Sequence, residues 1–354
     1  MFLKKRRNDS FSNRFFIGGN IEDKFMIFLQ QSFLFISVIF VTGCVSLGKY
    51  WSLVTVPQES GSKLTKITEV TDLVDTEESF AISKDGTKIA FTSWKTGNGD
   101  IYVKSLKGSK GITQRTSRAE TEINPSFSPD GSQIVFCAPR DNSRHIYMIQ
   151  AEGGSAVRQI TTSSPRYAYY PSFSPDGKKV LFYSIDYVLN PNTQKWEPKD
   201  FTIWTYEVNT GMLTQWTSGV LPKFTPDGEK IVFKKQASGD KYYGLWMLDL
   251  KTGAETHIIG GQDFGIWQFD VSPDGKKIVF SSDKDTKDSS KERKNANIWV
   301  VNIDGTELTQ LTFHMSDDIW PVWAPDMTGI YFLSSRGEDK KEIMNIWRIE
   351  YENK

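Results

Sequence analysis

The sequence contains very little cysteine. Its 354 residues include only two, Cys44 and Cys137, which stand in quite different contexts. Two cysteines are too few for the disulfide framework on which small secreted domains depend. The fold must therefore rest on a hydrophobic core, and each cysteine needs its own explanation. Cys137 follows an apolar run at the end of an expected strand, which predicts a small, buried hydrophobic side chain.

The sequence also lacks an excess of charge of either sign, and it has little histidine. Its 43 basic residues balance 43 acidic ones, so the basic surface typical of nucleic-acid binding is missing. We therefore expect no nucleic-acid partner. There are only three histidines, and no two of them have the spacing of metal ligands. We expect no cofactor and no resident metal.

Long apolar runs are absent as well. The longest, residues 33–42, has ten residues, whereas a membrane-spanning helix needs about 20. It follows a basic N-terminal segment and ends beside the small residue Gly43, which is the order found in secretory signal peptides. Residues 1–43 are therefore predicted to be a signal peptide. An uncleaved signal anchor and a start at Met26 are the alternatives.

The end of this segment resembles the lipobox of bacterial lipoproteins. Val41, Thr42 and Gly43 precede Cys44, and in lipoproteins the cysteine at this place carries lipid and becomes the new N-terminus. The resemblance implies that Cys44 is lipidated and that residues 44–62 form a tether, whose Pro, Ser and Gly residues are typical of linkers. It also implies a location in the bacterial cell envelope, anchored to a membrane and facing the periplasm or the exterior.

The rest of the chain is rich in aromatic residues and contains a repeated turn. Aromatics make up 13% of the sequence, alongside many Thr, Val and Ile, which favours strands over helices. The sequence Phe-Ser-Pro-Asp-Gly at residues 127–131 recurs, with small changes, in five other places. A spacing of 45 to 52 residues between the turn aspartates indicates the blades of a β-propeller. These aspartates are Asp85, Asp130, Asp176, Asp227, Asp274 and Asp326.

Each repeat has the pattern of a four-stranded blade. Pro, Asp and Gly suit a tight turn, because Pro fixes φ, Asp bonds the nearby backbone and Gly accepts a left-handed conformation. The turn joins an inner strand to a second strand, and the third strand has an aliphatic residue followed by an aromatic one, such as Ile146 and Tyr147. Adjacent residues point to opposite faces, so each blade offers an aliphatic side to one neighbour and an aromatic side to the other. A fourth strand follows, as at residues 158–161, 213–216 and 308–312.

The sixth repeat ends after its third strand and therefore lacks an outer strand. Residues 64–68, which precede the first repeat, read like the fourth strand at residues 308–312. We predict that residues 63–68 pair with the strand around residues 346–348. The predicted fold class is all-β, a six-bladed β-propeller of four-stranded blades over residues 63–354, closed by an N-terminal strand that completes the last blade.

The repeat is similar to the WD-like propeller repeat of TolB, with five clear copies and a sixth that has Met327 in place of Gly. The resemblance implies a protein that binds a partner in the cell envelope. TolB also carries an α/β domain before its propeller, and we expect none within residues 44–62. A fold hosts many functions, so the likeness is a weaker guide to function than to fold.

Similar propellers also occur in prolyl oligopeptidase relatives and in oligogalacturonate lyases. The first need a serine nucleophile, but the sequence contains no Gly-x-Ser-x-Gly elbow. The second use a His-rich metal site, whereas His257 is expected on an outer strand and His314 in a loop near the axis. We therefore expect a non-catalytic protein without catalytic residues. The alternatives are a carbohydrate-active enzyme, such as an oligosaccharide lyase with a metal at the axial mouth, and a structural envelope protein.

The expected binding site lies on one face of the propeller. The Pro-Asp-Gly turns define one side, here called the turn face. The loops between second and third strands, and those between consecutive blades, define the other side, here called the loop face. The loop face holds the longest insertions, residues 185–200 and 283–295, and loops on a rigid scaffold often carry recognition.

Acidic and aromatic residues gather in the loops of this face nearest the axis. We therefore predict that an envelope protein or glycan binds there, through a basic segment or a cation. The partner-binding residues are predicted to be Glu120, Glu122, Tyr169, Asp263, Trp267, Asp317, Asp318 and Trp320, with Asp72, Asp75, Glu77 and Glu78 adding to the acidic charge. The alternative for each is that the aromatics pack between inner strands and the acids are merely solvated.

Overall fold

A computed structural model describes residues 64–69, 79–107, 111–154, 156–162, 165–284, 295–314, 316–336 and 344–351, the first of these ranges by its backbone only. Every regular element in these ranges is a β-strand, so the predicted all-β fold is confirmed. The chain forms two compact units, of which one comprises Leu47–Ile185 and Asp200–Lys354 and holds the propeller. The other comprises Met1–Ser46 and Asp186–Lys199, and only the second segment is described.

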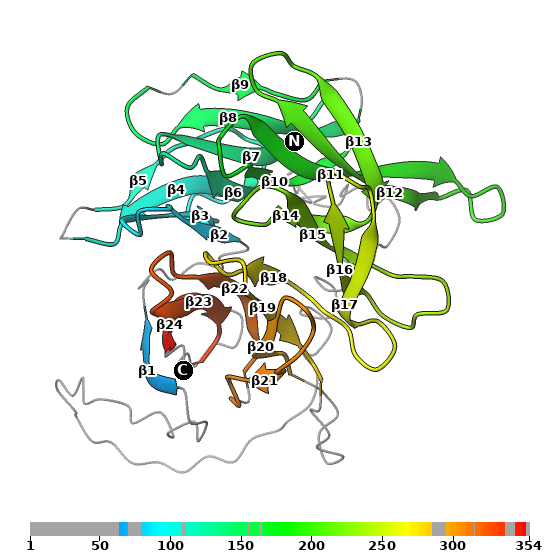
Figure 1. Cartoon of the computed structure of the whole chain (residues 1–354). Helices are drawn as coiled ribbons and strands as arrows, with labels where there is room; N and C mark the ends of the chain where they lie inside the picture. The colour runs from blue at the N-terminus through cyan, green and yellow to red at the C-terminus, as the bar shows by residue number, and fades with distance from the viewer. Residues whose placement is uncertain are drawn as a thin grey trace, which may run out of the picture. The chain divides into compact units, whose positions relative to one another are not determined.

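The strands form six antiparallel sheets of four strands, which are the blades of a propeller (Figure 1). Blade 1 contains β2 (Phe80–Ile82), β3 (Lys88–Ser93), β4 (Asp100–Ser105) and β5 (Thr113–Gln114), and blade 2 contains β6 (Ile123–Phe127), β7 (Gln133–Arg140), β8 (Ser143–Gln150) and β9 (Arg158–Gln159). Blade 3 contains β10 (Ala168–Phe173), β11 (Lys179–Leu189), β12 (Trp196–Glu207) and β13 (Leu213–Ser218), and blade 4 contains β14 (Val220–Phe224), β15 (Lys230–Lys235), β16 (Gly244–Asp249) and β17 (Glu255–Gly260). Blade 5 contains β18 (Phe269–Val271), β19 (Lys277–Ser282), β20 (Asn297–Asn302) and β21 (Thr309–Gln310), and blade 6 contains β22 (Asp318–Trp323), β23 (Gly329–Ser334), β24 (Asn345–Tyr351) and β1 (Leu64–Glu69).

The sixth blade joins the first and last described strands. β1 pairs antiparallel with β24, and Thr68 lies opposite Arg348 in this pairing. Figure 1 shows the two strands, blue and red, side by side. The predicted closure by an N-terminal strand is therefore confirmed. Blades 6 and 1 also meet near the axis, where a Cβ atom on Gly86 would lie 4.0 Å from Cδ of Pro325.

Each Pro-Asp-Gly turn is held by the hydrogen bonds that its residue types allow. In blade 2, Ser128 Oγ donates to the Asp130 carboxylate at 2.5 Å and the Ser132 amide donates to it at 3.0 Å. These bonds lower the pKa of Asp130 to about 2. Gly131 follows with a φ of 68°, which a residue with a side chain adopts only under strain. Equivalent bonds recur in the other blades, so the aspartates are turn formers, as predicted.

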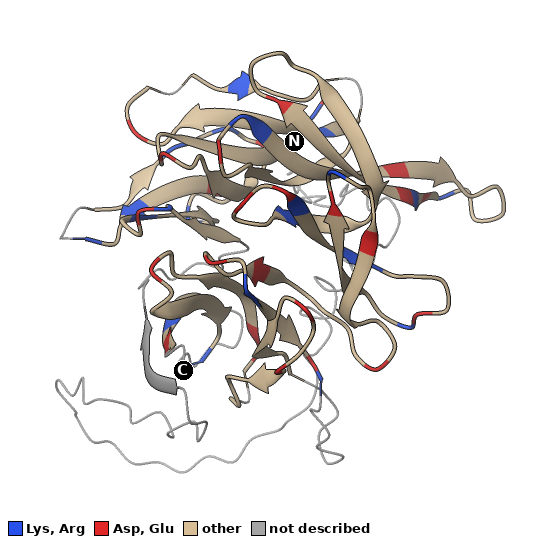
Figure 2. Cartoon of the chain, in the orientation of Figure 1, with Lys and Arg blue, Asp and Glu red and all other residues tan. Residues whose placement is uncertain are grey.

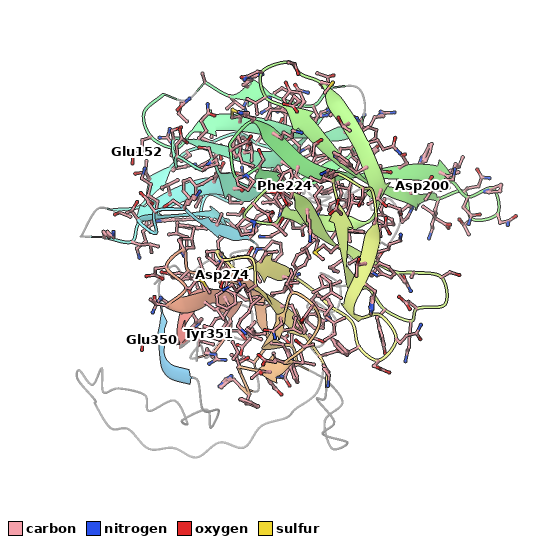
Figure 3. All side chains as sticks on the ribbon, viewed as in Figure 1. Glu152, Asp200, Phe224, Asp274, Glu350 and Tyr351 are labelled. Atoms are coloured by element: carbon pink, nitrogen blue, oxygen red, sulfur yellow. The ribbon has the colours of Figure 1, made fainter. Side chains whose placement is uncertain are left out.

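The blades pack through the two faces of their sheets. Between blades 1 and 2, Ile101 and Val103 of blade 1 meet Phe136 and Tyr147 of blade 2. The core between blades 5 and 6 is built in the same way. Aliphatic residues therefore face one neighbour and aromatic residues the other, as predicted, and burying each large side chain contributes roughly 1.5–3 kcal/mol. Figure 3 shows the side chains that fill the space between the sheets, with Phe224 toward the middle of the ring.

The outer strand of blade 2 is shorter than the sequence predicts. The prediction covered residues 158–161, but only the first two form β9. The Ile146 amide donates to Thr161 Oγ1 at 2.9 Å, so a side chain replaces the backbone ladder at this point. Thr116 and Thr312 accept equivalent bonds in blades 1 and 5. Threonine at this place therefore ends the strand.

Of the two cysteines, the structure describes Cys137 and not Cys44. Cys137 is fully buried, as predicted for a small hydrophobic side chain. Cys44 lies outside the described residues, together with the predicted signal peptide and tether, so these stay predictions. No helix that is long and apolar enough to span a bilayer occurs in the described part of the chain.

Candidate functional site

The inner strands of the six blades enclose a cavity of about 620 Å³ on the propeller axis. Its size is in the range of sites that take small ligands or short segments of a partner. Three rings of residues line it, each with one residue from every blade. From the turn face inward these rings consist of Lys84, Pro129, Pro175, Pro226, Pro273 and Pro325; of Ala81, Ser126, Ser172, Lys223, Asp270 and Val322; and of Ser79, Asn124, Tyr170, Leu221, Gln268 and Trp320.

The cavity is reached from the turn face. Lys84, Pro226 and Pro273, which form part of the first ring, are exposed. The lining ends at the third ring, and no described residue on the loop-face side of that ring contributes to it. The sequence predicts a binding mouth on the loop face. The opening of this cavity on the turn face was not predicted.

Two aromatic side chains close the axis at the third ring. Tyr170 of blade 3 and Trp320 of blade 6 come from opposite sides of the ring and stack with their centroids 5.6 Å apart. Both have left-handed φ angles, 51° and 57°, and both precede a proline. That conformation is unfavourable for bulky residues and is restricted further before proline, with a cost of about 1–3 kcal/mol each. The surrounding structure must therefore hold the pair in place.

The strained residues belong to β-bulges that recur in four inner strands. The pairing of β6, β10, β14 and β22 with their second strands shifts register at Asn124, Tyr170, Leu221 and Trp320. Each of these has a positive φ and is followed by proline. Because proline has no amide hydrogen, the ladder breaks there and an extra residue is accommodated. The four X-Pro pairs are the sequence signal that would have located these bulges.

The middle ring of the cavity is neutral. Lys223 Nζ lies 2.9 Å from Asp270 Oδ1, and Asp270 Oδ2 accepts from the Trp323 amide at 2.9 Å. These contacts join blades 4, 5 and 6. The ring otherwise consists of small or apolar residues, two of which are serines. Its wall therefore suits an uncharged segment that makes a few hydrogen bonds.

Only one of the three predicted aromatic contacts lines the axial cavity. Trp320 lines the cavity, whereas Trp267 is half-buried and does not. Tyr169 stacks on Tyr183 at 5.6 Å, and the guanidinium carbon of Arg144 lies 5.1 Å from its ring centroid. The structure thus brings only Trp320 to the axis. A role for Tyr169 and Trp267 in partner binding stays a prediction.

Two of the predicted acidic contacts are buried, which differs from the expectation of a solvent-facing site. Asp318 has no exposed surface and forms an ion pair with Arg336, which is 2% exposed. Glu122 also has no exposed surface, and burial raises its pKa to about 7. Asp318 is the first residue of β22 and Glu122 directly precedes β6, and both are covered by neighbouring elements. A partner on the surface therefore does not reach either carboxyl group in this structure.

The other predicted acids lie nearer the surface. Asp263 is exposed, while Glu120 and Asp317 are partly exposed. Asp317 accepts a hydrogen bond of 2.8 Å from the Ala296 amide, so it also holds the loop. The remaining acids that predicted an acidic mouth, Asp72, Asp75, Glu77 and Glu78, lie outside the described residues.

Basic residues also lie on the loop face, and Arg140 and Arg144 among them were not predicted there. The tight hairpin between β7 and β8 brings Arg140 and Arg144 there, beside the exposed Arg118 and Arg166. The Arg144 amide donates to Arg166 O at 2.9 Å, which joins two of these segments. Figure 2 shows acidic and basic positions interspersed over the ribbon. The described part of the loop face is therefore mixed in charge. The arginines at the ends of the hairpin between β7 and β8 are the sequence feature that would have predicted this.

The histidines do not converge. His257 lies on the outer strand β17, as predicted, with Nε2 3.1 Å from Gly260 O and its ring edge-on to Trp246. His314 lies in the loop before β22, where its Nδ1 accepts from the Ser316 amide at 3.0 Å and burial lowers its pKa. Within the described ranges, no three His, Cys, Asp or Glu side chains are grouped as metal ligands.

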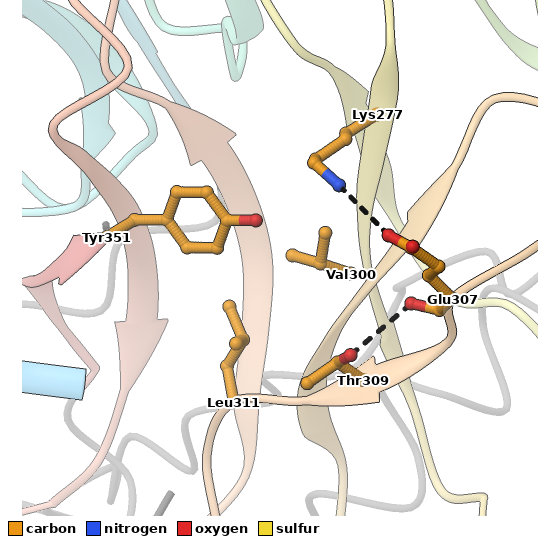
Figure 4. Close-up of a pocket in the computed structure, with 6 residues that line it drawn as sticks. All are labelled: Lys277, Val300, Glu307, Thr309, Leu311 and Tyr351. Atoms are coloured by element: carbon orange, nitrogen blue, oxygen red, sulfur yellow. Dashed lines mark hydrogen bonds and ion pairs between the residues drawn. The ribbon is translucent and has the colours of Figure 1, made fainter. Parts of the chain in front are cut away.

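A second cavity lies at the seam between blades 5 and 6 and holds only about 10 Å³ (Figure 4). Lys277 Nζ lies 3.8 Å from Glu307 Oε2 at its edge, and Thr309 Oγ1 donates to Glu307 O at 3.3 Å. The Tyr351 ring faces it from β24, and burial raises the pKa of this phenol. A space of this size has room for about one water molecule. It is a packing seam between blades.

The chain resembles known proteins over part of its length. Residues 54–187 match the family model described as the TolB beta propeller domain. Uncharacterized peptidase YuxL of Bacillus subtilis (strain 168) is 25% identical over 184 residues, which is 43% of this chain and 28% of that protein. Dipeptidyl-peptidase 5 of Porphyromonas gingivalis is 25% identical over 118 residues, which is 31% of this chain and 16% of that protein. The chain thus spans less than a third of either relative.

Solved structures share the fold over more of the chain. TolB from Acinetobacter baumannii has a TM-score of 0.56 at 23% identity, covering 71% of this chain and 57% of that one. A putative TolB from Agrobacterium tumefaciens has a TM-score of 0.58 at 20% identity, covering 83% and 100%. Oligogalacturonate lyase from Vibrio parahaemolyticus has a TM-score of 0.55 at 13% identity, covering 82% and 95%. At these identities the likeness concerns the fold.

The closed ring of six four-stranded blades places the protein in the class of six-bladed β-propellers. The matched repeat and the two TolB structures specify the type. The protein has a TolB-like six-bladed β-propeller, as the sequence resemblance implied.

Proposed function

We propose that this protein is a non-catalytic binding module of the bacterial cell envelope. It is anchored to a membrane by lipid on Cys44, faces the periplasm or the exterior, and holds a protein or glycan partner at the loop face. The TolB-like propeller supports a binding role in the envelope. The lipobox-like residues 41–44 support the anchor. No nucleic acid and no cofactor take part in this proposal.

The observation that carries the proposal is the stacked pair of Tyr170 and Trp320 on the axis. Backbone strain of this kind clusters at functional sites, and aromatic side chains near the centre of a surface are common anchors for a partner. Exposed polar residues surround the axis on the loop face, among them Arg118, Arg166 and Asp263. An aromatic centre with a polar rim is the usual anatomy of a protein interface.

Charge reversal on the loop face tests the proposal. Asp263→Lys combined with Glu120→Lys is expected to weaken capture of a basic partner segment about tenfold or more, since each change puts like charges together. The measurement is crosslinking in membranes followed by pull-down of one stoichiometric envelope protein. Glu229→Lys is the matched control, because Glu229 is exposed on the turn face. If the control abolishes capture and the double reversal does not, the loop face is the wrong surface.

A second candidate is a carbohydrate-active enzyme. The observation in its favour is the likeness to oligogalacturonate lyase, which covers 95% of that chain. The test is metal analysis of the purified protein together with turnover of oligogalacturonate. Stoichiometric metal with turnover would support the enzyme.

A further inference from the structure

Two blades contain a carboxyl group and an arginine at equivalent positions. In blade 6, Asp318 stands two residues before the bulge at Trp320, and Glu122 stands two residues before the bulge at Asn124 in blade 2. The arginines correspond as well, because Arg336 and Arg140 each follow the buried Phe of the second strand by four residues. Blade 6 therefore serves as an internal comparison for blade 2.

The pair is closed in blade 6 and open in blade 2. Arg336 donates to Asp318 in blade 6, and both side chains are buried. In blade 2 the guanidinium carbon of Arg140 lies 4.0 Å from the ring centroid of Tyr147, whereas that of Arg336 lies 6.0 Å from the equivalent Trp347. Among the described atoms, Arg140 Nε and Nη2 have no hydrogen-bond acceptor, and the fully buried carboxyl group of Glu122 lies beside Thr116 and Asp100. Buried polar groups in this state are rare and call for an explanation.

Asp100 of blade 1 explains the open pair. Its Oδ2 accepts hydrogen bonds from Thr96 Oγ1 and from Gln114 Nε2, whereas its Oδ1 is buried without a donor in the described structure. A proton carried by Glu122 provides the missing donor for Asp100. It also removes the charge that would otherwise draw Arg140 away from Tyr147.

The surroundings of Glu122 favour the protonated form. Burial is the largest cause that raises its pKa to about 7, and the charge of Asp100 adds to it, while Thr116 and Arg140 act in the opposite direction. These groups come from β4, from the loop before β6 and from β7. Further out, around Tyr147, lie Arg118, Glu120 and Asp141.

We propose that the seam between blades 1 and 2 is a proton-operated latch. In the protonated state Glu122 donates to Asp100, and Arg140 rests on Tyr147. When Glu122 releases its proton to solvent, its carboxylate accepts from Arg140 Nη2, as Asp318 accepts from Arg336 Nη2 in blade 6. The loop that carries Arg118 and Glu120 runs directly into Glu122, so the latch changes the loop face. That last consequence rests on the proposed function, whereas the latch itself does not.

The titration of Glu122 in the folded protein tests the latch. The carboxyl carbon resonance in protein labelled with ¹³C-glutamate is expected to titrate near pH 7, and Glu122→Gln should remove that resonance alone. Arg140→Gln should raise the midpoint and Asp100→Asn should lower it, each by about one pH unit, because one removes a favourable charge and the other an unfavourable one. Asp318→Asn is the matched control in blade 6 and should leave the midpoint unchanged.

The midpoint of the Glu122 titration and its response to the variants decide whether the latch exists. A Glu122 midpoint below pH 5 overturns it, as does a midpoint that responds to neither Arg140→Gln nor Asp100→Asn. The pH dependence of unfolding gives a second readout. Since the folded pKa is raised above the unfolded value, the stabilisation is fully present below about pH 4.5 and is lost as pH rises through about 7. This loss should be absent in Glu122→Gln. Partner capture is not needed for either measurement, so failure of the latch and failure of the proposed function are distinguishable.

Discussion

At the scale of single residues, the buried ion pair in blade 6 shows how strongly context decides a role. Asp318 was expected at a binding surface, but it neutralises Arg336 inside the blade. Removing one partner of a buried pair leaves the other charge without compensation in a medium of low polarity. The pair therefore has a structural role, and removing it should lower the free energy of unfolding.

Asp318→Asn is predicted to destabilise the protein by about 3–5 kcal/mol. The measurement is equilibrium unfolding in urea, followed by the intrinsic fluorescence of the tryptophans. Asp263→Asn makes the same chemical change at an exposed position and should cost less than about 0.5 kcal/mol. Equal losses in the two variants would show that Asp318 is not part of a stabilising pair.

At the scale of strands and turns, β1 is the element on which ring closure depends. It has the only strand pairing in the described structure that joins the N-terminal side of the repeats to the last blade. Without it, the outer edge of β24 would present unpaired backbone groups to solvent. The rest of blade 6 would keep its pairings but lose its outer cover.

Two truncations measure the contribution of β1. A protein that begins after Thr68 is expected to melt at least about 5 °C below the full domain, which corresponds to roughly 2 kcal/mol in a protein of this size. A protein that begins after Pro57 keeps all of β1 and should melt within about 1 °C of the full domain. Equal melting temperatures for the two truncations would contradict a closing role for β1.

The sequence predicted the elements that depend on local chemistry. The turn at Asp130 and the pairing of β1 with β24 follow from residue types and from the internal repeat, and both are confirmed. The burial of Glu122 and Asp318 did not follow, because burial depends on which segments cover a loop after the ring has closed. The stack of Tyr170 on Trp320 was also beyond the sequence, since it joins blades 150 residues apart.

At the scale of the whole molecule, the proposed role requires that the propeller be held at a membrane. The lipid prediction rests on Cys44, and Cys44→Ala is expected to leave the precursor unprocessed or to release the protein from the membrane fraction. Two acyl chains give stable anchoring where one alone is marginal. Cys137→Ala is the control, because Cys137 is buried in the propeller and should not affect fractionation. Unchanged processing and membrane retention of Cys44→Ala would rule out the anchor.

The two faces of the propeller present different surfaces to a partner. The turn face gives access to the axial cavity past a ring of five prolines and Lys84. The loop face carries the irregular loops and is separated from that cavity by Tyr170 and Trp320. The central claim is that the partner docks on the loop face.

Site-specific photocrosslinking in cells tests that claim most directly. A photoreactive amino acid at Arg118 or Arg166 samples the loop face, and one at Lys84 or Glu229 samples the turn face, all four positions being exposed. The account predicts that the two loop-face positions crosslink to the same envelope protein and that the two turn-face positions do not. Crosslinks from Lys84 or Glu229 alone would contradict it and would place the partner at the open end of the cavity.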